Sequence, residues 1–217
     1  MELEDILKLP FQLPQETVDY LKDNAELLTF KKTQVISAQG EVSRHLYLLK
    51  SGIARYYHTN YALGGKEDTI VFGTSGDVGT SLTSLAHNLP AVFSLGAITR
   101  VEMYAIPTKL ILDLTETDHT FCKWFFKLTL WQLALLETRY EFMCAPDAYS
   151  RYLAFLKIRS KEFINRIPLR YIASYLNITP QTMSELRARY AHDTVKSEFD
   201  TSLHKKGIIH NNVGLDD

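Results

Sequence analysis

One segment limits the possible folds of this chain more than any other: residues 166–190, "RIPLRYIASYLNITPQTMSELRARY". It holds two short apolar patterns of helical period, and only the three residues "NIT" separate them. Ala173 is small where a following helix would cross, and Asn177 stands at the joint, where a residue must tolerate a positive φ. The apolar residues that would fill the space between the helices are Leu169, Ile172, Leu176, Ile178, Met183 and Leu186. This spacing predicts a helix-turn-helix, although an ordinary corner of two helices has similar requirements.

The second helix of this segment is predicted to present polar side chains to DNA. Thr179 suits the N-cap, and Pro180 suits the first helical position, where a missing N–H costs no hydrogen bond. Glutamine pairs with adenine, arginine with guanine or phosphate, and serine with several bases. Glu185 leaves two interpretations open: it accepts from cytosine N4, or it pairs with Arg189 along the helix. The predicted DNA-binding residues are Arg170, Thr179, Gln181, Thr182, Ser184, Glu185, Arg187 and Arg189.

The charge is unevenly distributed along the sequence. The formal net charge is −1, but the stretch from Arg151 to Arg189 holds eight basic and two acidic residues. Such a basic region in an otherwise acidic chain favours an anionic partner, although a solvated helix face would have the same composition.

Residues 1–117 have the pattern of a small helical start followed by many short strands. Residues 3–28 predict short helices, with Val18, Leu21 and Ala25 on one face. Strand-like runs then alternate with turn signals from Leu28 to Ile106, and eight of the ten glycines lie between Gly40 and Gly96. This pattern predicts an antiparallel sandwich or barrel, with a jelly roll as the leading candidate.

A long helix is predicted over residues 118–143, capped by Asp118 or Thr117. Apolar residues recur in it with heptad spacing, and further apolar residues lie outside that seam, so the helix must be buried on two sides. We expect one side to meet the chain's own strands and the other to pair with a second copy. The central helix of a monomeric core is the alternative. The predicted dimer residues are Phe121, Trp124, Leu128, Trp131, Leu135 and Phe142.

Residues 144–217 are predicted to form a helix-turn-helix domain with a polar tail. "CAPDAYS" predicts a hinge, and "DAYSRYLAFLKIRSKEF" predicts an amphipathic helix. Residues 191–217 are polar and poorly periodic, with one possible hairpin at "KKGIIHNN". The fold class is therefore predicted as α+β, with a sensor-like β-roll (1–117), a dimerisation helix (118–143) and a DNA-binding domain (144–217).

This order of elements resembles the Crp/Fnr family of bacterial transcription regulators. The matching segments are "FKKTQVISAQGE", "HLYLLKSGIARYY", "GGKEDTIVFGTSGDVG" and "RIPLRYIASYLNITPQTMSELR", and the last is most similar to members from the Bacteroidetes. The resemblance implies a cyclic-nucleotide-binding-like β-roll, a helix-turn-helix domain of the winged-helix type, and a homodimer that binds double-stranded DNA. It also implies RNA polymerase as a partner.

The effector site that this resemblance implies lacks the chemistry for a cyclic nucleotide. Family members that bind one carry Gly-Glu for the ribose and Arg-Ser for the phosphate. Here the Gly-Glu positions hold Thr80 and Ser81, with Gly79 one residue away, and the Arg-Ser positions hold Ala91 and Val92. A buried phosphate without a cation is costly, so we expect no binding of cyclic AMP. Two alternatives stay open: an unknown neutral or apolar effector near Trp124 or Trp131, or DNA binding that needs no effector.

Other functions have less support in the sequence. A jelly-roll metal enzyme would need a His/Glu ligand cluster, and His45, His58 and His87 lack that spacing, so we expect no enzyme and no cofactor. A degenerate sensor acting through protein contacts without DNA binding stays open. No stretch reaches about 18 uncharged apolar residues, no secretory signal is evident, and two cysteines suggest free thiols. The expected location is the cytoplasm, away from membranes.

Overall fold

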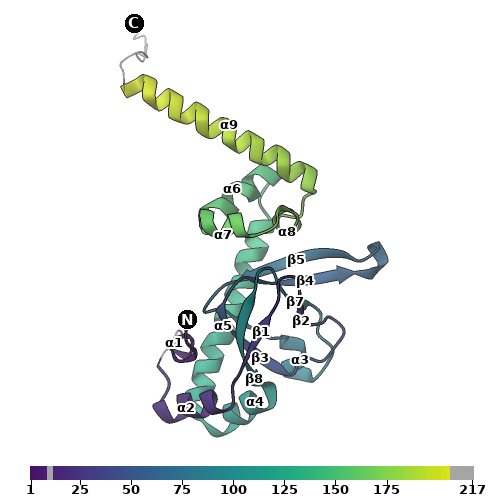
Figure 1. Ribbon diagram of the computed structural model, residues 1–217, viewed down its shortest axis with the longest axis vertical. Helices are drawn as coiled ribbons and strands as arrows, with labels where there is room; N and C mark the ends of the chain where they lie inside the picture. Colours follow the sequence, from purple (N-terminus) through teal and green to yellow (C-terminus); the bar gives the residue numbers. More distant parts are fainter. Residues whose placement is uncertain (9–11, 206–217) are drawn as a thin grey trace, which may run out of the picture.

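The computed structural model describes residues 1–8 and 12–205, with side chains to residue 194. Two short helices, α1 (Leu3–Leu7) and α2 (Gln15–Asp23), precede the strands (Figure 1). The strands are β1 (Glu26–Phe30), β2 (Val35–Ser37), β3 (His45–Ser51), β4 (Ala54–Asn60), β5 (Lys66–Gly73), β6 (Val78–Gly79), β7 (Ser94–Ala97) and β8 (Val101–Pro107). A 3-10 turn, η1 (Tyr61–Leu63), joins β4 to β5. Within the β-roll, the short strand β6 and the helix α3 (Leu82–His87) are elements that the hydrophobic pattern does not predict.

The strands form two antiparallel four-stranded sheets, ordered β1-β8-β3-β6 and β2-β7-β4-β5. The predicted jelly-roll-like β-roll is therefore confirmed. Between the sheets lies a core that includes Leu49, Leu95 and Met103. Gly52 shows why the turns are rich in glycine: its φ is 95°, and a Cβ there would lie 2.3 Å from the carbonyl oxygen of Arg100.

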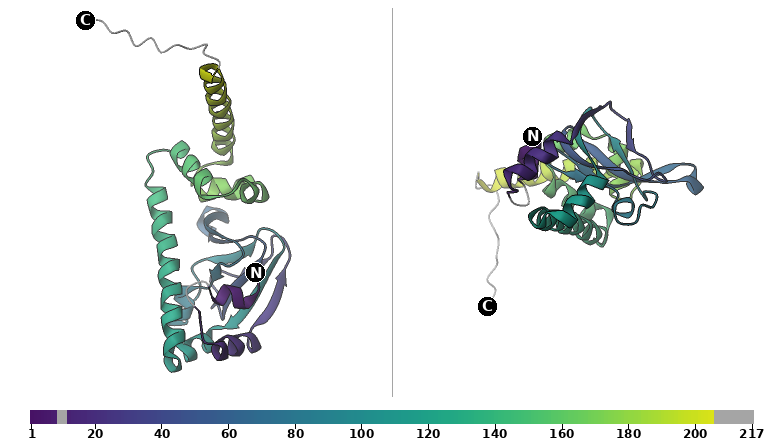
Figure 2. Two further views of the ribbon diagram at one scale, coloured as in Figure 1. Left: turned by 90° about the vertical axis from the view of Figure 1, so that its left-hand side faces the viewer. Right: turned by 90° about the horizontal axis from the view of Figure 1, so that it is seen from below.

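Helix α4 (Thr108–Thr117) follows the β-roll, and the long helix α5 (His119–Met143) runs beside it (Figure 2, left view). Asp118 caps α5 by accepting hydrogen bonds from the backbone N–H groups of Thr120 and Phe121, at 2.8 and 3.0 Å. The predicted helix over 118–143 is confirmed to within a residue.

One side of α5 belongs to the chain's own core. Phe121, Trp124 and Leu128 pack against α1, α2 and the β-roll, and Phe142 packs in the core around the C-terminal helices. These four residues are at most 8% exposed. Their assignment to a dimer seam is wrong, because a heptad pattern records which residues share a helix face and does not say what covers that face.

The C-terminal helices pack on the upper end of the β-roll. They are α6 (Ala148–Ile158), α7 (Lys161–Arg166), α8 (Leu169–Tyr175) and α9 (Pro180–Lys205). The single amphipathic helix predicted after the hinge is in fact two, because the Ser160 hydroxyl accepts a hydrogen bond from the N–H of Phe163 and starts α7. Their core includes Ile53, Phe72 and Ile98 of the β-roll, so the two parts of the chain share buried apolar contacts.

Helix α9 differs from the tail expected at residues 191–217. It continues without a break from Pro180 to Lys205 (Figure 1). No glycine occurs between these residues, and the only proline is at the first position, so nothing in the sequence ends the helix earlier. In the described part of the chain, this helix lies where a winged-helix domain would begin its wing. All but the first residue of the predicted "KKGIIHNN" hairpin lies outside the described residues.

Candidate nucleic-acid interface and ligand pocket

The helix-turn-helix predicted at residues 166–190 is present as α8, a tight turn and α9. Asn177 has a φ of 54°, as the predicted sharp turn requires. The N–H of Ile178 donates to the carbonyl of Ala173 at 3.0 Å and closes the turn. Ala173, Met183 and Leu186 are buried between the helices. The predicted N-cap is also confirmed, because Thr179 Oγ1 accepts from the N–H of Thr182 at 3.1 Å.

The outward face of α9 is polar and exposed. Residues at spacings of three, four, seven and eleven share one helix face, which groups Gln181, Ser184, Glu185 and His192 with the small Ala188. Every one of these five residues is exposed. His192 is the residue that the sequence reasoning missed, and the same periodicity extended by two turns would have included it.

Hydrogen bonds already hold parts of this face. Gln181 Nε2 donates to Glu185 Oε1 at 3.3 Å, and Ser184 Oγ donates to the carbonyl of Pro180 at 3.1 Å. Glu185 therefore has Gln181 as its partner, and the alternative pairing with Arg189 is wrong. Both Gln181 and Glu185 are exposed.

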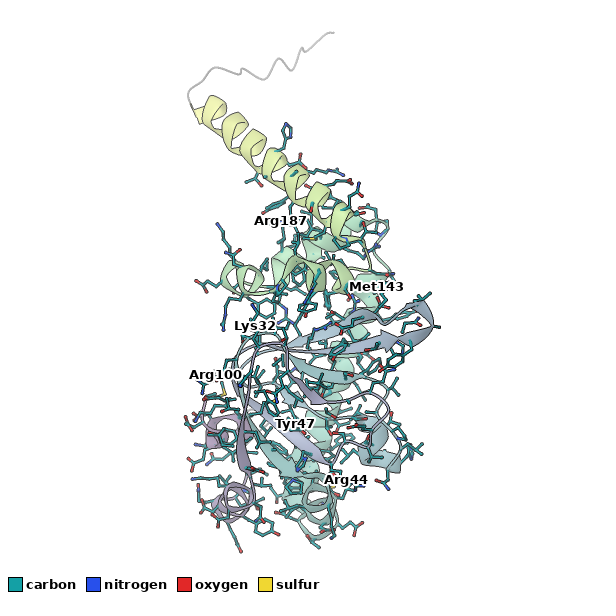
Figure 3. The ribbon with its side chains drawn as sticks, turned by 45° about the vertical axis from the view of Figure 1, so that its right-hand side comes forward. Lys32, Arg44, Tyr47, Arg100, Met143 and Arg187 are labelled. Carbon is teal, nitrogen blue, oxygen red and sulfur yellow. The ribbon has the colours of Figure 1, made fainter. Side chains whose placement is uncertain are left out.

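Arg189 holds α9 against α6. Its guanidinium lies 3.8 Å from the ring centroid of Tyr149, and its Nε lies 3.7 Å from Asp193 Oδ2. The Tyr149 hydroxyl donates to Asp193 Oδ2 at 2.6 Å, which lowers the pKa of Asp193 and raises that of Tyr149. Arg189 therefore acts within the domain, whereas Arg187 is exposed near the start of α9 (Figure 3).

Arg170 lies on the side of α8 that faces the β-roll. Its guanidinium donates to the Tyr171 hydroxyl at 3.0 Å and borders a polar cavity shared with Arg55 and Thr33. Arg170 is nevertheless exposed, so its place in the DNA-binding set stays a prediction.

An apolar pocket of about 290 Å³ lies between the β-roll and α5. Tyr56, Ile70 and Phe93 line its β-roll side, while Phe125 and Gln132 line its α5 side. No charged side chain is among the residues that line it. Burial raises the pKa of Tyr56, so its hydroxyl stays neutral at physiological pH.

The predicted effector residues are only partly brought together. Thr80, Ser81 and Val92 line the pocket. Ser81 also caps α3 by accepting from the N–H of Ser84, and Thr80 donates to the carbonyl of His45.

The other predicted effector residues lie elsewhere in the described structure. Gly79 packs under the Tyr56 hydroxyl, and Ala91 is buried outside the lining. The placement of both tryptophans beside the effector is wrong: Trp124 is in the core near α1, and Trp131 is 42% exposed on the surface of α5.

The side of α5 opposite the core carries an exposed apolar stripe. In Figure 2, the left view shows the β-roll on one side of α5 and open space on the other. Phe126, Leu130, Leu133 and Tyr140 are all exposed, and Glu137 completes alternating steps of four and three residues. Such a heptad stripe is typical of a helix that pairs with another helix. The two remaining predicted dimer residues, Trp131 and Leu135, are each two positions from Leu133, so they lie on the opposite side of α5 and are not part of this stripe; Leu135 lines the pocket.

No metal site or membrane span is evident in the described part of the chain. Among residues 1–8 and 12–194, no three His, Cys, Asp or Glu side chains come together as they would around a metal ion. No described helix is both long and apolar enough to cross a bilayer.

Comparison with known proteins shows which proteins share parts of this sequence and fold. Residues 27–118 match a family model described as "Cyclic nucleotide-binding domain". No curated protein sequence gave a match.

Solved structures of bacterial regulators are similar over most of the chain. FixK2 from Bradyrhizobium japonicum is 18% identical, with a TM-score of 0.67, over 88% of this chain and 89% of that one. CLP, a c-di-GMP-responsive global regulator from Xanthomonas campestris, is 13% identical, with a TM-score of 0.69, over 83% and 93%. A Crp/Fnr-family regulator from Eubacterium rectale is 16% identical, with a TM-score of 0.68, over 83% and 85%.

The chain therefore has a two-part architecture, a β-roll joined by a long helix to a helix-turn-helix. More particularly, the chain has the Crp/Fnr fold, with a domain that matches the cyclic nucleotide-binding family at residues 27–118. The closer likeness to Bacteroidetes members has no support from these comparisons.

Proposed function

We propose that this chain is a homodimeric transcription regulator that reads a two-fold-symmetric DNA site with the first turns of α9. The observation that carries the proposal is the exposed polar face of α9 on a complete helix-turn-helix. The Crp/Fnr fold supports it, because the similar structures are described as regulators. The proposed roles are sensing for residues 1–117, dimerisation for residues 118–143 and DNA binding for residues 144–217. RNA polymerase in the cytoplasm is the proposed protein partner.

Within α9, we assign different roles to different residues. Gln181, Ser184 and Glu185 share the outward face and are proposed to meet base edges in the major groove. Arg187 and Thr182 flank that face and are proposed to contact phosphates, which position the helix without reading sequence.

The homodimer is proposed to form through the exposed stripe on α5. Burying Phe126, Leu130, Leu133 and Tyr140 against a second copy would remove four large apolar side chains from water. Parallel pairing of α5 would also place two copies of α9 at the same end of the dimer, as a two-fold operator requires.

The pocket between the β-roll and α5 is proposed to bind a neutral, largely apolar effector. Its lining offers hydroxyl and amide groups from Thr80, Thr129 and Gln132, but no cation for a phosphate. Desolvating a phosphate there without a counter-charge would cost several kcal/mol. Cyclic AMP is therefore an unsuitable ligand, although the domain matches the cyclic nucleotide-binding family.

Selection from random DNA tests the proposed function. Purified full-length chain is incubated with a pool of random duplexes at about 0.15 M salt, and the bound fragments are sequenced. We expect an inverted repeat whose half-sites are centred about 10–10.5 base pairs apart, or a multiple of that spacing. Recovery of fragments without any shared motif would favour the degenerate sensor that acts through protein contacts.

A further inference from the structure

We propose that Ser174 and Arg55 are positioning residues for DNA recognition: they fix α8 on strand β5 and thereby set the direction in which α9 meets DNA. The inference rests on the proposed DNA-binding function and adds to it the contact that orients the recognition helix. Neither residue is expected to touch DNA.

Ser174 joins α8 to the open edge of β5. One edge of β5 pairs with β4 from Ala54 to Asn60. On β5 itself, the N–H of Thr69 donates to Ser174 Oγ at 2.7 Å, and Ser174 Oγ donates to the carbonyl of Glu67 at 3.0 Å. A single hydroxyl therefore satisfies two backbone groups of the strand, and it fixes α8 in both position and register.

Arg55 forms the second contact, from β4. It is 5% exposed, and its guanidinium lies between two aromatic rings, 4.0 Å from the centroid of Tyr57 and 3.8 Å from that of Tyr171. Nη1 donates to Thr69 Oγ1 at 3.1 Å, and Nη2 pairs with Glu67. Because Tyr171 belongs to α8, this buried cation links the helix-turn-helix to the same two residues of β5 that Ser174 contacts.

Apolar packing beside these polar contacts strengthens the junction. The ring of Phe72 on β5 lies 5.2 Å from that of Tyr175 on α8 and 6.0 Å from that of Phe163 on α7. Helix α9 follows α8 through the tight turn at Asn177 and buries Met183 and Leu186 against it. The direction of α9 therefore depends on the contacts that fix α8 on β5.

Strand β5 also borders the apolar pocket. Tyr56 pairs with Val71 and Tyr57 pairs with Thr69, so Ile70 is an extra residue that forms a bulge. Ile70 and Val71 both line the pocket, while the residues on either side of them, Thr69 and Phe72, hold the helix-turn-helix. The strand thus connects the proposed effector site directly to the contacts that hold α8 on β5.

Half-site spacing is the property that such a junction controls. A dimer can use both recognition helices only when their separation and direction match the operator. One added base pair turns a half-site by about 35° around the duplex, since a turn takes 10–10.5 base pairs. When α8 is held firmly on β5, the recognition helix α9 cannot follow that rotation. When α8 is loosened, α9 can follow it.

The test uses the full-length chain and the operator that the wild type selects from random DNA. Dissociation constants are measured for this operator, for versions with one base pair added or removed between the half-sites, and for a single half-site. Ser174→Ala should lower the preference for native spacing by about two- to tenfold, the range expected when a few hydrogen bonds are removed. Its affinity for the single half-site should equal that of the wild type.

Two further variants make the result decisive. Ser150→Ala removes a hydroxyl that donates to the N-cap residue of α6, Asp147, and is the matched control, so it should keep wild-type spacing preference. Arg55→Met should relax the preference at least as much as Ser174→Ala. Wild-type spacing preference in Ser174→Ala, or an equal loss on every DNA including the half-site, would overturn the inference. Failure of the wild type to select any two-fold operator would instead refute the proposed function itself, and the positioning role with it.

Discussion

The indole Nε1 of Trp124 donates a hydrogen bond to the backbone carbonyl of Leu7 at 2.7 Å. This bond ties the middle of the chain to its first helix, and it shows which side of α5 faces the chain's own core. The opposite side, with Phe126, Leu130 and Leu133, is therefore the one available to a second copy.

Leu133→Lys is expected to give a monomer that stays folded. Leu133 is 45% exposed in the protomer, so a lysine at this position can keep its charge in solvent and leave the fold intact. In the dimer, the same lysine would place a charge in the apolar seam. Sedimentation at micromolar concentration should show a dimer for the wild type and a monomer for the variant. Leu112→Lys on α4 is the matched control, since Leu112 is 41% exposed, and it should remain dimeric. A wild-type monomer would refute the proposed pairing.

Glu137→Leu is expected to tighten the dimer. Glu137 continues the stripe between Leu133 and Tyr140, so pairing would bring two carboxylates together in apolar surroundings. Removing them should lower the dimer dissociation constant at neutral pH at least about tenfold, or about 1.4 kcal/mol. Glu116→Leu on α4 adds the same apolar bulk away from the stripe and should have no effect. An unaltered dissociation constant in Glu137→Leu would mean that α5 pairs through another face.

Gln181→Ala and Arg187→Ala should weaken DNA binding in different ways. Removing the Gln181 side chain, if it bonds a base, should cost about 1–3 kcal/mol and relax specificity at one position of each half-site. Removing the Arg187 charge should weaken binding to all sequences and reduce the slope of log K against log salt by about one for each phosphate that is no longer neutralised. Binding curves at several salt concentrations separate the two. Unchanged specificity in Gln181→Ala would remove that residue from the reading face.

The pocket should bind a neutral apolar probe and reject cyclic nucleotides. Calorimetry with cyclic AMP or cyclic GMP should give no saturable signal below about 1 mM, equivalent to roughly −4 kcal/mol. The uncharged dye Nile red should bind, and Val71→Trp should weaken it by filling part of the cavity of about 290 Å³. Micromolar cyclic nucleotide binding that is lost in Val71→Trp would contradict this account of the pocket.

Asp118→Ala should destabilise the fold in a pH-dependent way. The backbone N–H of Phe121 is the main cause that lowers the pKa of Asp118, with further bonds from Thr17 and Thr120. A lowered pKa in the folded state means that the stabilisation is complete above the ordinary Asp value of about 3.9 and is lost as pH falls through the lowered value. Denaturation at pH 7 should show that Asp118→Ala lowers the free energy of unfolding by about 1 kcal/mol. The difference between the wild type and the variant should become smaller in acid, where the wild-type carboxylate is protonated. Asp113→Ala, at an exposed position of α4, is the control. A loss of stability in Asp118→Ala that is equal at all pH values would contradict the role given to the Asp118 carboxylate.

The sequence predicted best those features that depend on local chemistry. The offsets around Ala173 and Asn177 predicted the helix-turn-helix, because a tight helical joint permits few residue types. Glycine-rich turns predicted the β-roll, and Asp118 predicted the start of α5.

Features that depend on contacts far apart in the sequence could not be predicted in the same way. The period of α5 identified apolar faces but could not show that α1 and α2 cover Trp124. Arg189 was assigned by residue type, while Tyr149 of α6, forty positions earlier in the sequence, determines where its side chain lies. The junction of Arg55 and Ser174 joins β4, β5 and α8, and no single stretch of sequence contains it.

The most direct test of the central claim is an anisotropy titration of the wild-type chain against its selected operator and against a scrambled duplex of the same length and composition. At about 0.15 M salt, a sequence-reading dimer should bind the operator at least about a thousandfold more tightly, with two chains per duplex. Equal affinity for the two duplexes, or no binding to either, would contradict the account.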